Sequence, residues 1–253
     1  MSDYFQDKVI AISGGASGMG LEAAQLLSSK GAKVSIADVQ EGRLEEVKKE
    51  IESSGCQCLV CVTDVRIEAQ VQIWISNTIS HFGRLDGVAN LAAIVGKDVL
   101  MKATEDITTE DWNLVIGVNL TGMMNCLRAQ IPHLKAGASI VVVSSISGQR
   151  GFEKNGAYCA SKHGVIGLSR CTAKELGPKG IRLNIVAPGP IDTPLMRQTD
   201  DTRPDNQDMD FFSHLALKRV GKPLEVAELI EFLLSDKSSF ITGAVINIDG
   251  GWV

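Results

Sequence analysis

The chain has 253 residues, of which 44% are hydrophobic and 22% charged, values typical of globular proteins and far from those of disordered or collagen-like chains. Its net charge of -5 and its scattered Lys and Arg residues exclude a basic surface built to collect phosphates, so nucleic acid is not an expected partner. This length fits one α/β core, and we expect a single domain spanning residues 1–253.

Short apolar runs alternate with stretches of helical length along the chain. The first run is followed by Gly-rich residues and then by Leu21, Ala24 and Leu27 at helix-like spacing. A charged helix is predicted through about Ser53, and another ends near Phe82. The seven predicted strands are Val9–Ile12, Lys33–Ala37, Cys58–Val62, Leu85–Ala89, Ile140–Val143, Ile181–Val186 and Ala244–Ile248. This alternation predicts an α/β fold of Rossmann type: one doubly wound, mostly parallel seven-stranded sheet with helices on both faces.

Three cysteines, Cys56, Cys58 and Cys61, lie in and just before the third predicted strand. Such a cluster can bind a metal ion, but no fourth ligand stands at a suitable spacing and the segment alternates like a strand. We therefore expect buried free thiols and no metal site. No apolar run reaches the ~18 residues that span a bilayer, and the first residues lack the apolar segment of a signal peptide. The sequence thus predicts a cytoplasmic protein without disulfides or a membrane partner.

The segment from Pro194 to Pro223 is the one irregular stretch of the chain, and it mixes polar and apolar residues. Its apolar residues are Leu195, Met196, Met209, Phe211, Phe212 and Leu215. A long mixed insertion after the sixth strand is typical of a mobile lid over a binding site. These apolar side chains either face a bulky apolar substrate or hold the lid on the core, and the sequence leaves both alternatives open.

The turn after the first predicted strand is rich in glycine. It reads Ser13-Gly14-Gly15-Ala16-Ser17-Gly18-Met19-Gly20 and leads into a helix. Glycine lets the backbone turn tightly and approach a pyrophosphate, whose charge then sits at the positive N-terminus of the helix. Tight turns need glycine for structural reasons as well, but the position of this turn in a βαβ unit favours dinucleotide binding.

Asp38 ends the second predicted strand, 18 positions after Gly20. This is close to the spacing at which an acidic residue accepts hydrogen bonds from the ribose hydroxyls of a bound adenosine. A 2′-phosphate there would meet a like charge, and the neighbouring Val39 and Gln40 are not basic. We therefore expect NAD rather than NADP. The alternative is that Asp38 caps a helix that begins near Gln40.

Tyr158 and Lys162 stand four residues apart, and a helix predicted from Asn155 to Ala173 places both on one face. A free phenol, with a pKa of about 10, is a poor acid or base near neutrality, but a nearby cation lowers that pKa. The pair is thus suited to moving an alcohol proton. Ser145 follows the fifth predicted strand, where ligands of parallel sheets bind, and is suited to hydrogen-bonding a carbonyl oxygen. Each pattern also occurs by chance, as a surface helix or a serine-rich turn.

Taken together and in this order, these residues resemble the short-chain dehydrogenase/reductase family over nearly the whole chain. The matching positions are Gly14, Gly18, Gly20, Asp38, Asp64-Val65, Asn90, Asn119, Ser145, Tyr158, Lys162 and Pro188-Gly189 through Thr193. The resemblance implies that Asp64 and Val65 hold the adenine and that Asn90 supports the central strand beside the cofactor. It also implies that the backbone carbonyl of Asn119 holds a water that relays protons to Lys162.

By the same resemblance, Tyr158 and Lys162 also contact the cofactor. The further cofactor contacts it implies are Ser17, Met19, Ala92, Pro188, Gly189, Ile191 and Thr193, with Ile191 and Thr193 at the nicotinamide carboxamide. One departure lies after the fourth strand, where Asn90-Leu91-Ala92-Ala93 replaces the usual Asn-Asn-Ala-Gly. This exchange affects the backbone beside the cofactor.

We therefore predict an enzyme that transfers hydride reversibly between NAD and the carbinol or carbonyl carbon of a small-molecule substrate. In this hypothesis Tyr158 exchanges the proton, Lys162 lowers its pKa and Ser145 binds the oxygen. A bulky apolar substrate, such as a terpenoid, steroid or polyketide, is expected if the apolar residues of the lid face the site.

Two alternative functions remain open for this sequence, and the resemblance also implies an oligomeric state. A 3-oxoacyl thioester reductase is the nearest rival, but such enzymes of this family generally prefer NADP, which Asp38 disfavours. The other rival is a non-redox protein that keeps NAD as a structural element. The resemblance further implies a homotetramer or homodimer, formed through the predicted helices Glu110–Leu134 and Asn155–Glu175.

Overall fold

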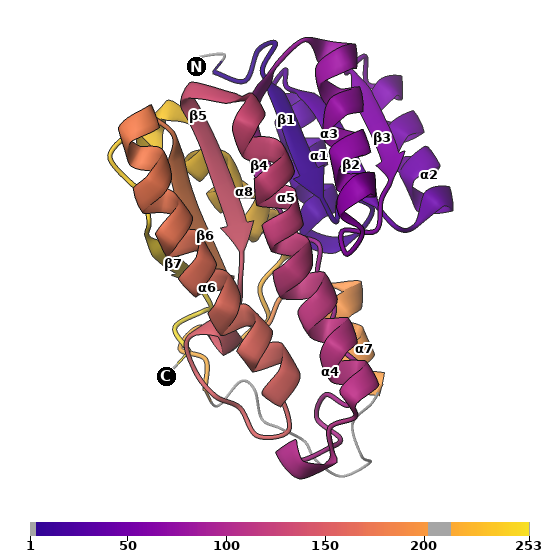
Figure 1. Cartoon of the computed structure of the whole chain (residues 1–253), viewed down its shortest axis with the longest axis vertical. Helices are drawn as coiled ribbons and strands as arrows, with labels where there is room; N and C mark the ends of the chain where they lie inside the picture. Colours follow the sequence, from indigo (N-terminus) through magenta and orange to yellow (C-terminus); the bar gives the residue numbers. More distant parts are fainter. Residues whose placement is uncertain (1–3, 202–213, 253) are drawn as a thin grey trace.

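The computed structural model describes residues 4–201 and 214–252. At its centre is a seven-stranded sheet in the order β3-β2-β1-β4-β5-β6-β7, and all the described pairings are parallel (Figure 1). The strands are β1 (Val9–Ser13), β2 (Lys33–Asp38), β3 (Cys58–Val62), β4 (Leu85–Asn90), β5 (Leu134–Val143), β6 (Arg182–Pro188) and β7 (Val245–Ile248). The predicted seven-stranded parallel sheet is confirmed.

Helices cover both faces of this sheet, as predicted. They are α1 (Gly18–Ser29), α2 (Glu41–Ser53), α3 (Glu68–Phe82), α4 (Thr109–Ile116), α5 (Gly122–Gln130), α6 (Gly156–Leu176), α7 (Pro194–Asp201) and α8 (Pro223–Leu234). Buried residues of α1, α2 and α8 share one apolar core, whereas those of α3, α5 and α6 share the other. In Figure 1 the second group lies in front of the sheet, with α1 and α8 behind it.

The first strand shows how the sequence builds these two cores. All five residues of β1 are buried, because β1 lies inside the sheet between β2 and β4. Successive side chains of a strand point to opposite faces. Accordingly, Ile10 and Ile12 join the core under α1 and α8, while Val9 and Ala11 join the core under α3 and α5.

The helix predicted from Glu110 to Leu134 is divided in the structure. A π-helical segment, Gly117–Thr121, separates α4 from α5, and a 3-10 turn, Ile131–His133, follows α5. Leu134 already belongs to β5, so the predicted C-terminal boundary is wrong. Proline at position 132 contributes to the early end, because it lacks the backbone N–H that a continuing helix would need.

The predicted lid segment is described in part. Its first residues form α7, and its last residues return to the core through two isolated bridges, Leu215 with Trp252 and Ile191 with Gly221. Leu215 is fully buried against Ile146 and Trp252. At this one position the side chain therefore holds the segment on the core. Met209, Phe211 and Phe212 lie outside the described residues.

The cysteine cluster differs in part from its prediction. Cys56, Cys58 and Cys61 are free thiols, but only Cys58 is buried, and the other two are half-buried at the edge strand β3 and its approach. Within residues 4–201 and 214–252, no group of three His, Cys, Asp or Glu side chains is placed to hold a metal ion. No helix in this part of the chain is both long and apolar enough to cross a bilayer.

Candidate active site

The glycine-rich turn between β1 and α1 packs closely against the backbone that follows β4. Gly14 has a φ of 72°, and a Cβ atom on it would lie 2.7 Å from the backbone nitrogen of Ala92. A Cβ atom on Gly20 would lie 2.1 Å from the carbonyl oxygen of Gly14. Real Cβ contacts are never this short, so only glycine fits at either position. The predicted residues Gly14, Gly20 and Ala92 therefore form one tight backbone cradle.

Helix α1 begins within this glycine-rich turn, at Gly18. Ser17 is its N-cap, yet among the described residues its hydroxyl makes no capping hydrogen bond, and the first turn carries no acidic side chain. The first N–H groups of a helix have no partner within it, and they carry partial positive charge. Thr193 contacts the turn, since a Cβ atom on Gly18 would lie 3.3 Å from its Cγ2 atom. The end of α1 is thus suited to a phosphate group.

Asp38 connects the end of β2 to the glycine-rich turn. Its Oδ2 atom accepts a hydrogen bond from the backbone N–H of Ala16 at 3.1 Å. Its Oδ1 atom accepts from the backbone N–H and the side-chain amide of Gln40, at 3.1 and 3.2 Å. The N-cap of α2 is Gln40 rather than Asp38, so the capping alternative is not what the structure shows. The half-buried carboxylate instead lies beside the turn.

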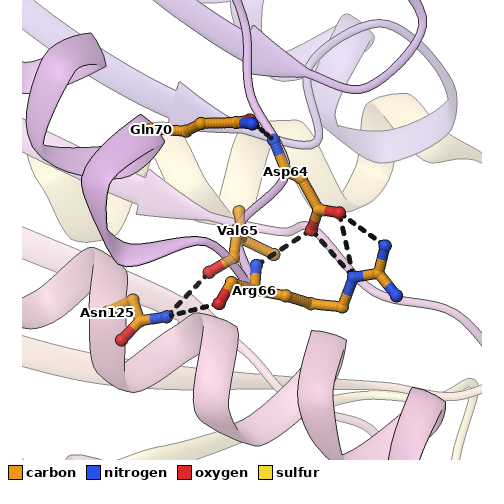
Figure 2. Close-up of polar contacts among 5 residues, drawn as sticks. All are labelled: Asp64, Val65, Arg66, Gln70 and Asn125. Atoms are coloured by element: carbon orange, nitrogen blue, oxygen red, sulfur yellow. Dashed lines mark hydrogen bonds and ion pairs between the residues drawn. The ribbon is translucent and has the colours of Figure 1, made fainter.

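Asp64 and Val65 follow β3 and are held by side chains from two helices (Figure 2). Asp64 donates its backbone N–H to Gln70 Oε1 at 2.7 Å, and Asn125 Nδ2 donates to the Val65 carbonyl at 3.0 Å. The Val65 N–H has no acceptor among the described residues, although Val65 is only 7% exposed. A carboxylate acceptor and an N–H donor without an acceptor among the described residues thus belong to consecutive residues. This pair matches the edge of adenine, which offers an amine donor beside a ring-nitrogen acceptor.

Asn90 ends β4 inside a buried amide pair with Gln130 of α5. Asn90 Nδ2 donates to Gln130 Oε1 at 2.9 Å, and Gln130 Nε2 donates back to Asn90 Oδ1 at 3.0 Å. The Ser13 hydroxyl also donates to Asn90 Oδ1. Despite the unusual residues after Asn90, the backbone N–H of Leu91 bonds to the Ser13 carbonyl at 3.0 Å. The end of β4 therefore stays attached to β1 beside the glycine-rich turn.

Asn119 lies in the π-helical segment and joins the loop after β4 to α6. Its amide accepts from the Ile94 N–H and donates to the Ile94 carbonyl, both at 2.9 Å, and donates to the Ser161 hydroxyl at 3.0 Å. The side chain is 1% exposed. π-helical turns widen a helix and are frequent at functional sites. Asn119 is thus fixed in place beside the helix that carries Tyr158 and Lys162.

Tyr158 and Lys162 lie on successive turns at the beginning of α6, on one face as predicted. Lys162 is 2% exposed. Its Nζ atom donates to the carbonyl of Val143 at 3.2 Å and stands 5.6 Å from the centre of the Tyr158 ring. Ser145 follows β5, and its hydroxyl accepts from the backbone N–H of Ser147 at 3.1 Å. The predicted trio of Ser145, Tyr158 and Lys162 is brought together.

Burial dominates the acid–base properties of this trio. It raises the pKa of Tyr158 to about 12, although a hydrogen bond with Ser145 acts in the opposite direction. Burial also lowers the pKa of Lys162 to about 8. For the protein alone the pKa of Tyr158 is therefore raised rather than lowered as expected, because desolvation of the phenol dominates. Near neutral pH, Tyr158 keeps its proton and Lys162 keeps most of its charge.

The segment after β6 carries the remaining predicted cofactor contacts. Pro188 ends β6 beside Ile248, and a Cβ atom on Gly189 would lie 2.8 Å from the Cα atom of Asp249. Ile191 and Thr193 are both buried. The Thr193 hydroxyl donates to the Ile191 carbonyl at 3.3 Å and accepts from the N–H of Met196 at 3.2 Å. These residues link β6 to α7.

Several residues that stabilise the site were not predicted from the sequence. Gln130, Asn125 and Ser161 are buried or bonded to site residues, but no local motif marks them. Asn155 is the N-cap of α6, and its buried Oδ1 atom has no partner among the described residues. It lines a cavity of about 10 Å³ with Tyr158, which is room for one water molecule. In the sequence, the feature that marks Asn155 is its position about one turn before Tyr158.

The chain is similar to known proteins along nearly its whole length. A family model described as enoyl-(acyl carrier protein) reductase matches residues 14–253. A short-chain dehydrogenase/reductase aba4 from Botryotinia fuckeliana is 45% identical, with 99% of this chain and 98% of the relative covered. A 3-oxoacyl-[acyl-carrier-protein] reductase from Thermotoga maritima is 38% identical over 98% of each. A cyclohexanol dehydrogenase from Acinetobacter is 34% identical over 100% of this chain and 97% of the relative.

Solved structures agree with these relatives. The crystal structure of levodione reductase superposes with a TM-score of 0.92 at 37% identity, covering 98% of each chain. A short-chain dehydrogenase from Burkholderia cenocepacia in complex with NADP has a TM-score of 0.88 at 29% identity, also covering 98% of each. The chain belongs to the short-chain dehydrogenase/reductase family, whose members are oxidoreductases that bind a nicotinamide cofactor.

Proposed function

We propose that the chain is an NAD-dependent oxidoreductase that interconverts a secondary alcohol and a ketone. The observation that carries this proposal is the group of Ser145, Tyr158 and Lys162 at the carboxyl ends of the parallel strands, the same sheet edge as the glycine cradle. In open α/β sheets this edge is where ligands bind. Bound NAD would supply or accept the hydride at C4 of its nicotinamide ring.

The chain's own residues then handle the oxygen and its proton. In ketone reduction, the Ser145 hydroxyl hydrogen-bonds the carbonyl oxygen as negative charge develops on it. Tyr158 gives its proton to this oxygen, for which its protonated form near neutral pH is suited. The Lys162 ammonium, 5.6 Å from the ring centre, stabilises the phenolate that remains. In alcohol oxidation the same residues act in reverse.

The preference for NAD rests on Asp38. Its carboxylate lies at the end of β2 against the N–H of Ala16, in the glycine-rich turn. There it would accept hydrogen bonds from ribose hydroxyls and repel a 2′-phosphate. This charge also argues against the rival function of 3-oxoacyl thioester reductase, which the relative from Thermotoga maritima supports. The Burkholderia relative carries NADP, so its complex does not support the preference for NAD.

We further propose a bulky apolar, cyclic substrate, because apolar and aromatic side chains lie close to Ser145. The next residue, Ile146, packs with Trp252, whose ring stands 5.7 Å from that of Phe152 in an edge-to-face contact. Apolar and aromatic walls with few polar groups are typical of sites for such ligands. The name of the related cyclohexanol dehydrogenase also indicates a cyclic alcohol. Better turnover of small polar polyols than of apolar ring alcohols would contradict this substrate class.

The test is single-turnover hydride transfer in the parent protein and in Tyr158→Phe, after a screen of secondary alcohols and ketones with NAD(H). Removing the phenol oxygen leaves the ring packing nearly unchanged. We expect turnover to fall at least about 100-fold, since general acid–base assistance contributes about 10²–10⁴-fold, while NADH affinity is largely kept. Near-equal rates in two variants with matching circular dichroism spectra would mean that Tyr158 is not the acid–base group. Hydride transfer absent from the parent itself would favour the non-redox alternative.

A further inference from the structure

The carboxylate of Asp64 is bound by the side chain of Arg66, two positions further along the chain. Arg66 donates from Nε to both carboxylate oxygens, at 3.0 and 2.9 Å, and from Nη2 to Oδ2 at 2.5 Å. The backbone N–H of Arg66 also donates to Asp64 Oδ1 at 3.0 Å. Figure 2 shows the guanidinium group beside both oxygens. A fork of this kind fixes the plane of a carboxylate, whereas a single contact leaves it free to rotate.

The backbone around this ion pair is fixed as well. Gln70 of α3 accepts the Asp64 N–H, and Asn125 of α5 donates to the carbonyls of Val65 and Arg66 at 3.0 and 3.3 Å. Asn125 is 4% exposed, so its amide is part of the folded core. Between these anchors the Val65 N–H is left without an acceptor among the described residues. Its direction is therefore set by contacts on both sides of it.

The charge of Arg66 determines what the Asp64 carboxylate can accept. The side-chain hydrogen bonds from Arg66 lower the pKa of Asp64, so the group stays ionised near neutral pH and acts only as an acceptor. A carboxylate offers about four lone-pair sites, and Arg66 brings three N–H groups to it, so a further donor can still approach. An amine meets this requirement, whereas a carbonyl oxygen is repelled. The ion pair itself is partly exposed, with 47% of Arg66 accessible, and adds little to folding stability.

We propose that Arg66 is a positioning residue for recognition of the cofactor base. By holding the Asp64 carboxylate beside the Val65 N–H, it maintains an acceptor–donor pair that selects an aminopurine such as adenine over an oxopurine such as hypoxanthine. This inference rests on the proposed binding of a nicotinamide dinucleotide. It adds to that binding a specific task for a residue that contacts neither the phosphates nor the reacting atoms.

The experiment compares Arg66→Gln with a matched control, Arg84→Gln. Arg84 forms the same type of ion pair, with Asp86 two residues away and with similar exposure, but at the start of β4, the opposite end of the sheet. Binding is measured by fluorescence titration with three reduced cofactors: NADH, its hypoxanthine analogue, and nicotinamide mononucleotide, which has no base. The parent protein is expected to bind NADH more tightly than the hypoxanthine analogue.

Arg66→Gln is expected to weaken NADH binding by about threefold to tenfold, which corresponds to about 0.7–1.4 kcal/mol. Its affinity for the hypoxanthine analogue should change less, so that discrimination between the two bases narrows. Affinity for the mononucleotide and the melting temperature should stay at the parent values, and Arg84→Gln should match the parent throughout. Arg66→Lys, which keeps the charge but not the fork, should fall between the two.

Two results would overturn the inference. One is unchanged discrimination between NADH and the hypoxanthine analogue in Arg66→Gln. The other is an equal loss of affinity for all three cofactors, which would show a general distortion of the site. A parent protein that binds no NADH at all would instead overturn the proposed function, so the two failures are distinguished by which protein shows them.

Discussion

The carboxyl ends of the seven strands hold two groups of polar residues in opposite electrostatic conditions. At β2 and β3, Asp38 and Asp64 are each bonded to two or more donors, and the pKa of Asp64 is lowered by Arg66. At β5 and α6, Tyr158 and Lys162 are desolvated, and burial shifts the pKa of both toward the neutral form. The first region stabilises the charged form of Asp64, whereas the second disfavours the charged forms of Tyr158 and Lys162.

Under the proposed function, this difference separates cofactor binding from proton transfer within one sheet edge. A binding group works best when its charge and direction are fixed before the ligand arrives, because no reorganisation is then needed. A group that moves a proton has to reach both protonation states, and here desolvation favours the neutral phenol of Tyr158 while the Lys162 ammonium is placed to stabilise its phenolate. Substitutions in the two regions should therefore fail in different measurements, binding in the first and rate in the second.

The largest effect is expected at the glycine cradle of the binding region. In Gly20→Ala the new Cβ atom would lie 2.1 Å from the Gly14 carbonyl oxygen and 3.0 Å from the Gly15 Cα atom. These are backbone atoms, so the turn has to move. We expect NADH affinity to fall at least about 1,000-fold, or about 4 kcal/mol, in fluorescence titration.

Gly42→Ala provides the control for this change. Gly42 lies in α2, and nothing stands within 4 Å of a Cβ atom placed on it. Alanine in a helix is favoured over glycine by up to about 1 kcal/mol, so this variant should bind NADH normally and melt at the same or a higher temperature. Tight NADH binding by Gly20→Ala would show that the cradle is not the cofactor site.

An intermediate effect is expected in the chemical region, for Lys162→Met. The folded protein binds fewer protons at this site than the unfolded chain between pH 8 and pH 10.5, the folded and ordinary pKa values of Lys162. Burying the ammonium therefore costs stability below pH 8, and the cost is relieved as pH rises through this range. We expect the variant to lose about 100-fold in turnover and yet to gain stability at pH 7, on the order of 2 kcal/mol.

Denaturant unfolding at a series of pH values measures this gain, which should shrink between pH 8 and pH 10.5. In the parent, kcat/KM for ketone reduction should fall above about pH 8 as Lys162 loses its proton. Lys174→Met, on the exposed side of the same helix, should alter neither stability nor rate. A destabilised Lys162→Met variant at pH 7 would contradict the role given to burial.

The smallest effect is expected for the charge of Asp38. We expect the parent to bind NAD at least about tenfold more tightly than NADP, or about 1.4 kcal/mol. Asp38→Asn keeps an oxygen for the Ala16 N–H but removes the charge, so NADP binding should improve and the gap should narrow. Calorimetric titration measures both affinities, and Glu41→Gln, an exposed carboxylate nearby on α2, controls for net charge. Equal affinities in the parent would contradict the assignment of NAD.

The sequence by itself determined the architecture and the candidate catalytic positions. Apolar runs at the spacing of strands placed all seven strands to within a few residues, except for the early start of β5 at Leu134. Resemblance in the order of motifs selected Ser145, Tyr158 and Lys162, and the structure brings these together. The apolar runs are local and the motifs keep their order along the chain. Both can therefore be recognised from the sequence alone. Assembly into a homotetramer or homodimer stays a prediction.

Only the tertiary structure decided how these residues are held and how they ionise. Asn90 pairs with Gln130, 40 positions away, and Asn125 reaches Val65 across 60 positions. No local pattern encodes such partners, because they meet only when the sheet and its helices have packed. The same holds for the pKa of Tyr158, which the sequence indicated should fall and which burial raises. Desolvation depends on all the atoms that surround a group, and those atoms come from parts of the chain far apart in sequence.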